Sequence, residues 1–235
     1  MIDFSKFEKK INIEFKDKNL LKQAFTHRSY INENPPPPGG LPLEHNERME
    51  FLGDAVLELA ITEYLYRNYP HKTEGEMTGF RAALVNAKML SEVAGKISMG
   101  DFLLLSRGES KDNGRARQFI LANTFEALVG AIYLDSGYAA AFEFLTGSLL
   151  PEIKEIIAKK LWIDSKSLFQ EKAQEFENVT PSYKVIRETG PDHAKYFIVG
   201  VHIGDELVAE GEGVSKQEAE QDAASNALRL KKWKV

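Results

Sequence analysis

Apolar residues recur at spacings of three and four through most of the first 160 residues, which is the pattern of amphipathic helices. The segment 32–46 interrupts this pattern with four consecutive prolines, which break a helix and predict a surface loop. No alternation of apolar and polar residues, the pattern of strands, occurs in this part. Five helical segments are expected: 19–30, 47–69, 77–97, 117–137 and 138–160.

After residue 160 the pattern changes to that of a mixed unit. A helix is expected at 167–176, and a closing helix at 215–233 begins with a predicted Ser215–Glu218 capping box. Between these helices lie three short runs rich in β-branched and aromatic residues, which predict strands. The three strand candidates are 182–190, 194–204 and 206–214.

The two patterns predict two domains. We expect an all-α domain over 1–158, a short charged linker over 159–163 and a small α+β domain of α-β-β-β-α order over 164–235. The chain has no cysteine and its N-terminal residues lack a continuous apolar run, so we expect a cytoplasmic protein without disulfides. No membrane-spanning helix is expected, because no stretch of about 18 apolar residues lacks charge. The net charge of -5 gives no overall basic field for a nucleic acid.

Four acidic residues fall on one edge of the helix predicted at 47–69. They are Glu47, Glu50, Asp54 and Glu58, and the opposite face of the same helix is apolar. A solvated face is the ordinary explanation for charges on one side of a helix. Such faces usually mix signs, because like charges at i,i+4 destabilise a helix by about 0.2–0.5 kcal/mol per pair. An edge without any Lys or Arg therefore also fits a cation-binding surface.

A second helix carries polar oxygens where burial is expected. The stretch FILANTFEALVGAIYL, residues 119–134, is apolar on most sides, yet it contains Asn123 and Glu126. An isolated carboxylate in apolar surroundings needs a proton, a basic partner or a metal ion. If Asn123 and Glu126 face Glu50 and Asp54, four oxygen-bearing side chains converge without Cys or His. This is a donor set for Mg²⁺, with Mn²⁺ able to replace it.

The segment HNERMEFLGDAVLELAITEYLY, residues 45–66, is similar to the signature of the ribonuclease III family. AFTHRSY (24–30), TEGEMTGFRAALVNAKML (73–90) and ILANTFEALVGAIYLD (120–135) follow in that family's order. The C-terminal part resembles a double-stranded-RNA-binding domain, through SLFQEKAQ, the GPDH loop (190–193) and SKQEAEQDAASNAL. The resemblance covers nearly the whole chain.

The resemblance implies an Mg²⁺-dependent endoribonuclease that works as a homodimer on double-stranded RNA. Each subunit would cut one strand, leaving a 5'-phosphate, a 3'-hydroxyl and short 3' overhangs, in the processing of ribosomal and other structured transcripts. The positions that match the family's motif are a metal-binding quartet of Glu50, Asp54, Asn123 and Glu126, in which Asp54 and Glu126 are catalytic. Further matching positions are the accessory acids Glu47 and Glu74 and the dimer contact Phe51, for which ordinary core packing is the alternative.

Residue 123 departs from the family pattern, which most often has Asp there. Asn123 keeps one ligating oxygen but loses the negative charge, which lowers the expected affinity for metal. An active enzyme is favoured because Glu50, Asp54 and Glu126 remain. One alternative is a duplex-RNA-binding protein whose cleavage centre is crippled by Asn123. A helical metal-binding or dimerisation protein unrelated to RNA would explain the acids but not the C-terminal domain.

The C-terminal segment is not basic, because residues 164–235 hold ten Lys and Arg against thirteen Asp and Glu, giving -3. Binding of a duplex must then depend on a few placed contacts. The resemblance implies Gln170 and Glu171 in one minor groove, the loop with His193 in the next, and Lys216 on phosphates between them. Gln217 stands where the family often has a second lysine, so the salt dependence should be shallow.

Overall fold

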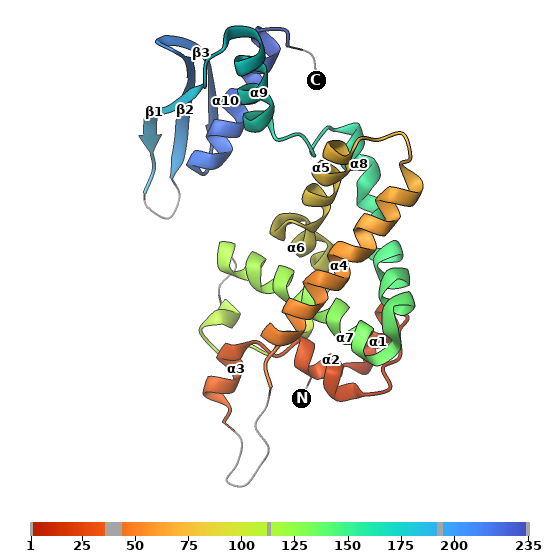
Figure 1. Cartoon of the computed structure of the whole chain (residues 1–235). Coiled ribbons are helices and arrows are strands. Elements are labelled where there is room, and N and C mark those ends of the chain that lie inside the picture. The colour runs from red at the N-terminus through yellow and green to blue at the C-terminus, as the bar shows by residue number, and fades with distance from the viewer. Residues whose placement is uncertain (1, 36–43, 112–113, 192–194, 234–235) are drawn as a thin grey trace. The chain divides into compact units, whose positions relative to one another are not determined.

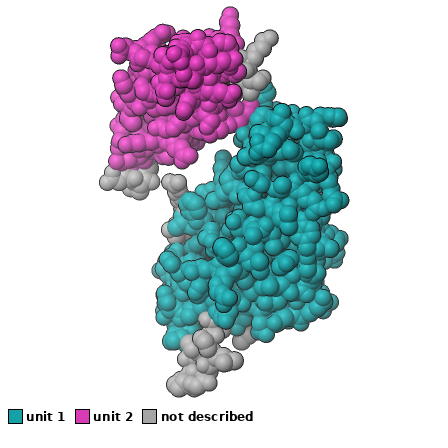
Figure 2. All heavy atoms as spheres, in the orientation of Figure 1, with its two compact units in different colours: residues 1–162 teal, residues 163–235 magenta. Residues whose placement is uncertain are grey.

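The structure is a computed structural model that describes residues 2–35, 44–111, 114–191 and 195–233. The chain forms two compact units, residues 1–162 and 163–235 (Figure 2). The first unit is helical and the second has three strands and two helices (Figure 1). This confirms the predicted fold class of an all-α domain followed by an α-β-β-β-α domain.

Two long helices form the centre of the first unit. Helix α4 (Glu47–Asn68) packs along helix α7 (Arg115–Ser148). Both lengths agree with the predicted helical periodicity, and the boundary expected at 137/138 coincides with a kink at Gly137, where the backbone of α7 is not helical. The buried side chains between and around them include Val56, Leu57, Ala60 and Ile61 from α4 and Phe125, Leu128, Val129 and Ile132 from α7.

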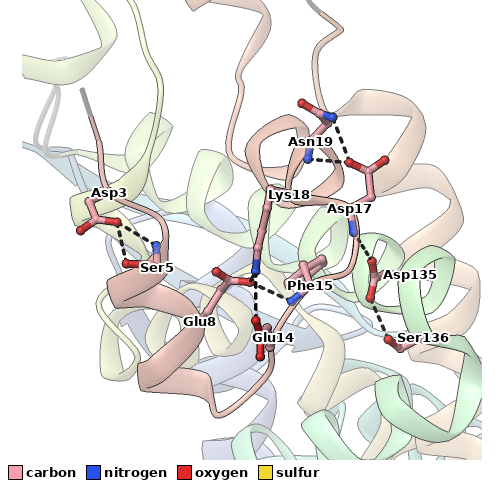
Figure 3. Close-up of polar contacts among 10 residues, drawn as sticks. All are labelled: Asp3, Ser5, Glu8, Glu14, Phe15, Asp17, Lys18, Asn19, Asp135 and Ser136. Atoms are coloured by element: carbon pink, nitrogen blue, oxygen red, sulfur yellow. Dashed lines mark hydrogen bonds and ion pairs between the residues drawn. The ribbon is translucent and has the colours of Figure 1, made fainter.

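An N-terminal helix that periodicity did not predict, α1 (Ser5–Ile11), is held by a buried carboxylate. Glu8 accepts a hydrogen bond from the Phe15 backbone N–H at 2.7 Å and pairs with Lys18 at 2.6 Å (Figure 3). Nearby, the Asp17 backbone N–H donates to Asp135 of α7 at 2.9 Å. These bonds fix the N-terminal segment and the start of α2 (Lys18–Ala24) against the central helix.

The single helix predicted at 19–30 is wrong, because the chain breaks after α2 and restarts as α3 (Arg28–Glu33). At the break the Thr26 hydroxyl donates to the Lys22 carbonyl, and Thr26 pairs with Leu104 in an isolated parallel β-bridge. The His27 ring then caps α3 by accepting from the Ser29 N–H. Contact with a distant segment overrides the local helical pattern here.

The helix predicted at 77–97 is also two helices, α5 (Glu74–Val85) and α6 (Ala87–Lys96). Asn86 separates them in an extended conformation, and its side chain accepts from the Met89 N–H at 2.9 Å. A capping box of Thr73 and Glu76 starts α5. Asn therefore ended one helix and capped the next, a use of this residue that apolar spacing does not reveal.

Helix α7 bends at Gly137, whose φ of 83° and ψ of 179° are non-helical. By length and composition alone its stretch Ala116–Ser148 is apolar enough to cross a membrane, although it contains charged residues. Half of its most apolar window is buried inside the protein, which is the behaviour of a core helix. The remaining elements of the first unit are η1 (Met99–Phe102), η2 (Glu109–Lys111), η3 (Leu150–Glu152) and α8 (Ile153–Ala158).

The boundary between the units lies between Trp162 and Ile163, inside the segment predicted as a linker. Trp162 belongs to the first unit because its ring meets Phe80 edge-on, with centroids 5.0 Å apart. Gly79 lies against the same residue, and a Cβ there would come within 2.9 Å of the Trp162 carbonyl oxygen.

The second unit is a three-stranded antiparallel sheet in the order β1-β2-β3, with α9 and α10 on the same side of it (Figure 1). Its core contains the side chains of Phe169, Val201, Ala223 and Ala227. A Cβ on Gly211 would lie 1.9 Å from the backbone nitrogen of Ala223, so glycine lets α10 approach β3 closely. The elements are α9 (Ser165–Glu177), β1 (Ser182–Thr189), β2 (Tyr196–Ile203), β3 (Glu206–Gly213) and α10 (Lys216–Leu230).

The predicted capping box of α10 forms only in part. The Ser215 hydroxyl accepts from the Glu218 N–H at 3.2 Å, as expected. The Glu218 carboxylate, however, accepts from the N–H of Val214 and not from that of Ser215. Two side chains of α10 also reach the outer edge of β3, where Asp222 accepts from the Glu212 N–H and Asn226 donates to the Glu210 carbonyl.

Candidate active site

The site is built where the backbones of α4 and α7 almost touch. A Cβ on Gly53 would lie 1.8 Å from the backbone oxygen of Glu126, and one on Gly130 would lie 2.4 Å from that of Met49. Real Cβ atoms do not approach so closely, so only glycine fits at these two positions. The crossing therefore fixes the part of α4 that carries Glu50 and Asp54 against the part of α7 that carries Glu126.

This crossing brings the acids of α4 to the polar residues of α7. Glu50 and Asp54, one turn apart, act electrostatically on Glu126, and the Asn123 side chain acts as a hydrogen-bond donor to Glu50. Glu50, Asn123 and Glu126 are half-buried, whereas Asp54 is exposed. Glu50 and Asp54 are thus near enough to Glu126 to act on it, while the convergence of all four side chains on one ion and the ligand role of each stay predictions.

Glu126 is the most strongly perturbed carboxyl of this group. Burial, and next the negative charges of Asp54 and Glu50, raise the pKa of Glu126 from 4.5 to about 8. The same causes, burial first and then the charge of Glu47, raise the pKa of Glu50, and the hydrogen bond from Asn123 opposes that rise. No ion pair between described residues neutralises Glu50, Asp54 or Glu126, so the cluster lacks a compensating positive charge.

The donor set suits a hard divalent cation. Carboxylate and amide oxygens are the ligands that Mg²⁺ and Mn²⁺ prefer, and a cation would relieve the repulsion that raises the pKa of Glu126. Within the residues that the structure describes, no three His, Cys, Asp or Glu side chains stand close enough to hold a metal ion as they are. The side chains fit a cation by chemistry and position, and would have to close around it.

Two acids of the predicted stripe have basic partners from other helices. Arg81 of α5 pairs with Glu58 at 2.8 Å, and Arg28 of α3 lies 3.5 Å from Glu47. The expectation of a stripe without positive charges holds along α4 itself but is wrong for the folded surface. These pairs separate the stripe into neutralised ends and an unneutralised centre at Glu50 and Asp54.

Glu74 is not brought to this centre. It is exposed at the first turn of α5 and accepts a hydrogen bond from Thr78 at 3.1 Å. It lines a hollow of about 180 Å³ together with Thr62 and Tyr66 of α4. Those residues follow Asp54 by two to three turns, which is roughly 12–18 Å along the helix. Within one chain Glu74 therefore does not contact the α4–α7 centre, and its accessory role stays a prediction.

Phe51 is not a core residue, since its side chain is 83% exposed. The alternative of ordinary core packing is thus wrong. Phe51 lies beside a hollow of about 710 Å³ that Met49, Leu52 and Leu134 also line. Its role as a dimer contact stays a prediction.

A polar wall beside the quartet was not assigned from sequence. His27, Arg28 and Asn32 line a hollow of about 630 Å³ together with Glu50 and Asn123. Burial lowers the pKa of His27, and its Nδ1 accepts from Ser29, so the neutral ring carries its proton on Nε2. His27 and Arg28 lie in the quoted AFTHRSY stretch and Asn32 follows it two residues later, and the signal for them was a polar sequence in the middle of a helical pattern.

The expected RNA-binding side chains of the second unit are at its surface where the structure describes them. Gln170 and Glu171 are exposed on α9 and line a shallow hollow with Ser167 and Gln174. Lys216 is exposed at the first position of α10, with its ammonium 5.8 Å from the centre of the Phe197 ring. His193 lies outside the described residues.

The fold and site define a class of protein, namely a helical domain with a cluster of acidic side chains, joined to a small α-β-β-β-α domain. Residues 17–153 match the family described as Ribonuclease-III-like, and residues 165–231 match the double-stranded RNA binding motif. Ribonuclease 3 of Borreliella burgdorferi is 44% identical over 96% of this chain and 90% of its own length. Ribonuclease 3 of Carboxydothermus hydrogenoformans is 45% identical over 96% and 94%.

A solved structure agrees with these matches. The nuclease domain of ribonuclease III from Campylobacter jejuni is 38% identical, with a TM-score of 0.55, over 66% of this chain and 96% of that one. A second structure of that domain is described as flexible in a region involved in dimer formation. The chain belongs to the ribonuclease III family of double-stranded-RNA-specific endoribonucleases.

Proposed function

We propose that the chain is a Mg²⁺-dependent, homodimeric, cytoplasmic endoribonuclease that uses the α4–α7 centre to cut both strands of an RNA duplex. The products are a 5'-phosphate, a 3'-hydroxyl and short 3' overhangs, and the substrates are ribosomal precursors and other structured transcripts. The observation that carries this proposal is the backbone crossing at Gly53 and Gly130, which sets Glu50 and Asp54 beside Glu126 without a neutralising base.

Each residue of the centre has a role that follows from its surroundings. Glu50, Asp54, Asn123 and Glu126 are the oxygen donors that would hold the ion. When bound, Mg²⁺ lowers the pKa of a coordinated water and neutralises the phosphate under attack. Glu126 holds a proton at neutral pH in the cation-free protein, because its pKa is about 8, and gives it up when positive charge arrives. Asp54, being exposed, is the carboxylate on the solvent side, where a duplex can reach.

The second unit supplies the duplex contacts. Gln170 and Glu171 on α9 present short polar groups suited to the 2'-hydroxyls of a minor groove. Lys216 at the N-terminus of α10 adds its charge to the positive end of the helix dipole, which suits a phosphate. A segment with formal charge -3 binds through such placed groups and not through a general basic field.

The homodimer is supported by the exposed ring of Phe51 on α4. A phenyl group that is 83% exposed beside an apolar hollow favours burial against another surface. The dimer formation described for the Campylobacter jejuni domain concerns that protein. For this chain we propose that Phe51 lies in the contact between two nuclease units.

The proposal is tested by cleavage of a perfect RNA duplex with Mg²⁺, with Mn²⁺ and with a chelator. We expect cleavage that needs a divalent cation and that Glu126→Gln reduces by at least about a hundredfold. Glu143→Gln is the matched control, since Glu143 is an exposed acid farther along α7. Cleavage of equal rate by the parent and by Glu126→Gln would show that the chemistry is assigned to the wrong residue.

One residue, Asn123, supports a second candidate function for this chain. The Asn123 amide adds no negative charge to the centre, so an ion there is held by one charge fewer than with Asp at this position. The second candidate is a duplex-RNA-binding protein without effective cleavage. Asn123→Asp separates the two: cleavage by the parent supports the enzyme, whereas cleavage that appears only after the substitution supports the binding protein.

A further inference from the structure

The side of the sheet that α9 and α10 leave uncovered carries an apolar centre. Ile186 and Leu207 are 49% and 45% exposed there. A Cβ on Gly200 would lie 2.7 Å from Leu207 Cδ1 and 2.9 Å from Ile186 Cδ1, so both side chains lean over this glycine from the flanking strands. Ile198, half-buried, follows on the same side of β2. We call this side of the sheet the outer face.

The charges on the outer face are arranged by strand. Bases lie on β1 and acids lie on β3, at the two margins of the apolar centre. The strand pairing links them in two rows, Lys184–Gly200–Glu210 and Arg187–Ile198–Glu212. All four charged side chains are exposed, and among the described residues none of them takes part in an ion pair. Glu212 also accepts a hydrogen bond from the Tyr196 hydroxyl.

This pattern is complementary to itself under one particular rotation. A two-fold axis that runs parallel to β2, between two outer faces, exchanges β1 with β3 but keeps each row at its own height. The first row then sets Lys184 of each copy against Glu210 of the other, and the second row sets Arg187 against Glu212. An axis perpendicular to the strands would set base on base and acid on acid, which is unfavourable.

We propose that the outer face binds the outer face of a second copy of this chain, related by a two-fold axis parallel to β2. The contact is an isologous sheet-on-sheet packing about 10 Å apart, with the two β2 strands running in nearly the same direction. Ile186, Ile198 and Leu207 form its dry centre. Four ion pairs form its margins, two from each row.

RNA does not suit this surface. A phosphate chain crossing the outer face would meet Glu210 and Glu212 as often as Lys184 and Arg187, so the face offers no net attraction. The groups expected to contact RNA lie elsewhere, on α9 and at the start of α10. Two copies of the RNA-binding unit can therefore associate while each remains free to bind a duplex.

The size of the face sets the strength of the contact. Three strands about 4.8 Å apart and eight residues long cover roughly 350 Å² per copy. Twice that area is below the 1,200 Å² typical of stable specific complexes. The association should therefore depend on concentration, and should gain strength wherever copies are already held together, as on one RNA molecule.

A charge-exchange experiment on the full-length chain tests the proposal. The variants are Lys184→Glu with Arg187→Glu, which makes both margins acidic, and Glu210→Lys with Glu212→Lys, which makes both basic. Lys232→Glu, an exposed charge beyond α10, is the control. Sedimentation velocity over a concentration series at low salt, without RNA or divalent ions, gives the average mass. Association through the nuclease units is a baseline common to all variants.

The expected result has three parts. The average mass of the parent and of the control rises with concentration above the baseline, and each double variant alone raises the dissociation constant of this step at least about tenfold. An equimolar mixture of the two double variants regains the rise, because acidic and basic margins again face each other. The recovery cannot come from unfolded protein. The proposal is overturned if the average mass of the parent depends on concentration in the same way as that of the double variants. It is also overturned if the mixture of the two double variants does not regain the rise in average mass.

Discussion

The substitution Gly53→Ala should damage both stability and catalysis through a single contact. The added Cβ would lie 1.8 Å from the Glu126 backbone oxygen, against an ordinary contact of about 3.5 Å. Helices α4 and α7 must therefore separate locally by roughly 1.7 Å. Overpacking of this kind costs about 3 kcal/mol or more. A displacement of about 1 Å among catalytic groups can reduce the rate a hundredfold.

Urea unfolding and duplex cleavage with saturating Mg²⁺ measure the two effects on the same preparation. The control is Gly95→Ala, because a Cβ on this helical glycine meets nothing within 4 Å. It should raise stability by about 0.5–1 kcal/mol and leave cleavage unchanged. If Gly53→Ala unfolds at the same urea concentration as the parent and cleaves at the same rate, the crossing does not position the site as described.

Three further predictions concern charge and exposure. Without divalent ions, the folding stability of the parent should fall as pH rises from about 4.5 through about 8, because the pKa of Glu126 is raised in the folded protein. Thermal scans from pH 5 to pH 9 should therefore show that Glu126→Gln becomes increasingly more stable than the parent. Addition of Mg²⁺ should stabilise the parent but not this variant. Lys216→Ala should weaken duplex binding and lower the slope of log affinity against log salt by about 0.9, whereas an unchanged slope would remove this phosphate contact. Phe51→Ala should increase dissociation to monomers in analytical ultracentrifugation with less than about 0.5 kcal/mol change in monomer stability, because the ring is exposed; an unchanged dimer excludes it from the contact.

The sequence predicted the α4–α7 core and the break at Gly137 well, and missed the breaks at Thr26 and Asn86. Periodicity identified α4 and most of α7 because both helices bury a long apolar side against each other. The break at Thr26 depends on its β-bridge to Leu104, and the break at Asn86 depends on the cap that its side chain forms. Neither interaction changes the spacing of apolar residues, so periodicity does not reveal them. The ends of the three strands were predicted to within one or two residues, because runs of β-branched and aromatic residues are bounded by glycines and other turn residues.

Within the site, helical spacing could place residues on faces but could not pair those faces. The grouping of Glu50 and Asp54 on one edge follows from a rotation of 100 degrees per residue. Which part of α7 lies opposite them depends on the close approach at Gly53 and Gly130, and a lone glycine in a helix has no unique meaning in a sequence. The partners Arg28 and Arg81 come from other helices and were invisible for the same reason.

The carboxylate of Glu126 also bears on the transfer of helix α7 into a lipid bilayer. Helix α7 has the length and the apolar composition of a membrane-spanning helix, although it is a core helix here. An ionised side chain near the middle of such a helix costs on the order of 3 kcal/mol for insertion. Asp135 adds a second charge, and the bend at Gly137 shortens the straight segment. The group proposed to serve cleavage therefore also raises the free energy that transfer of this apolar helix into a lipid bilayer would cost.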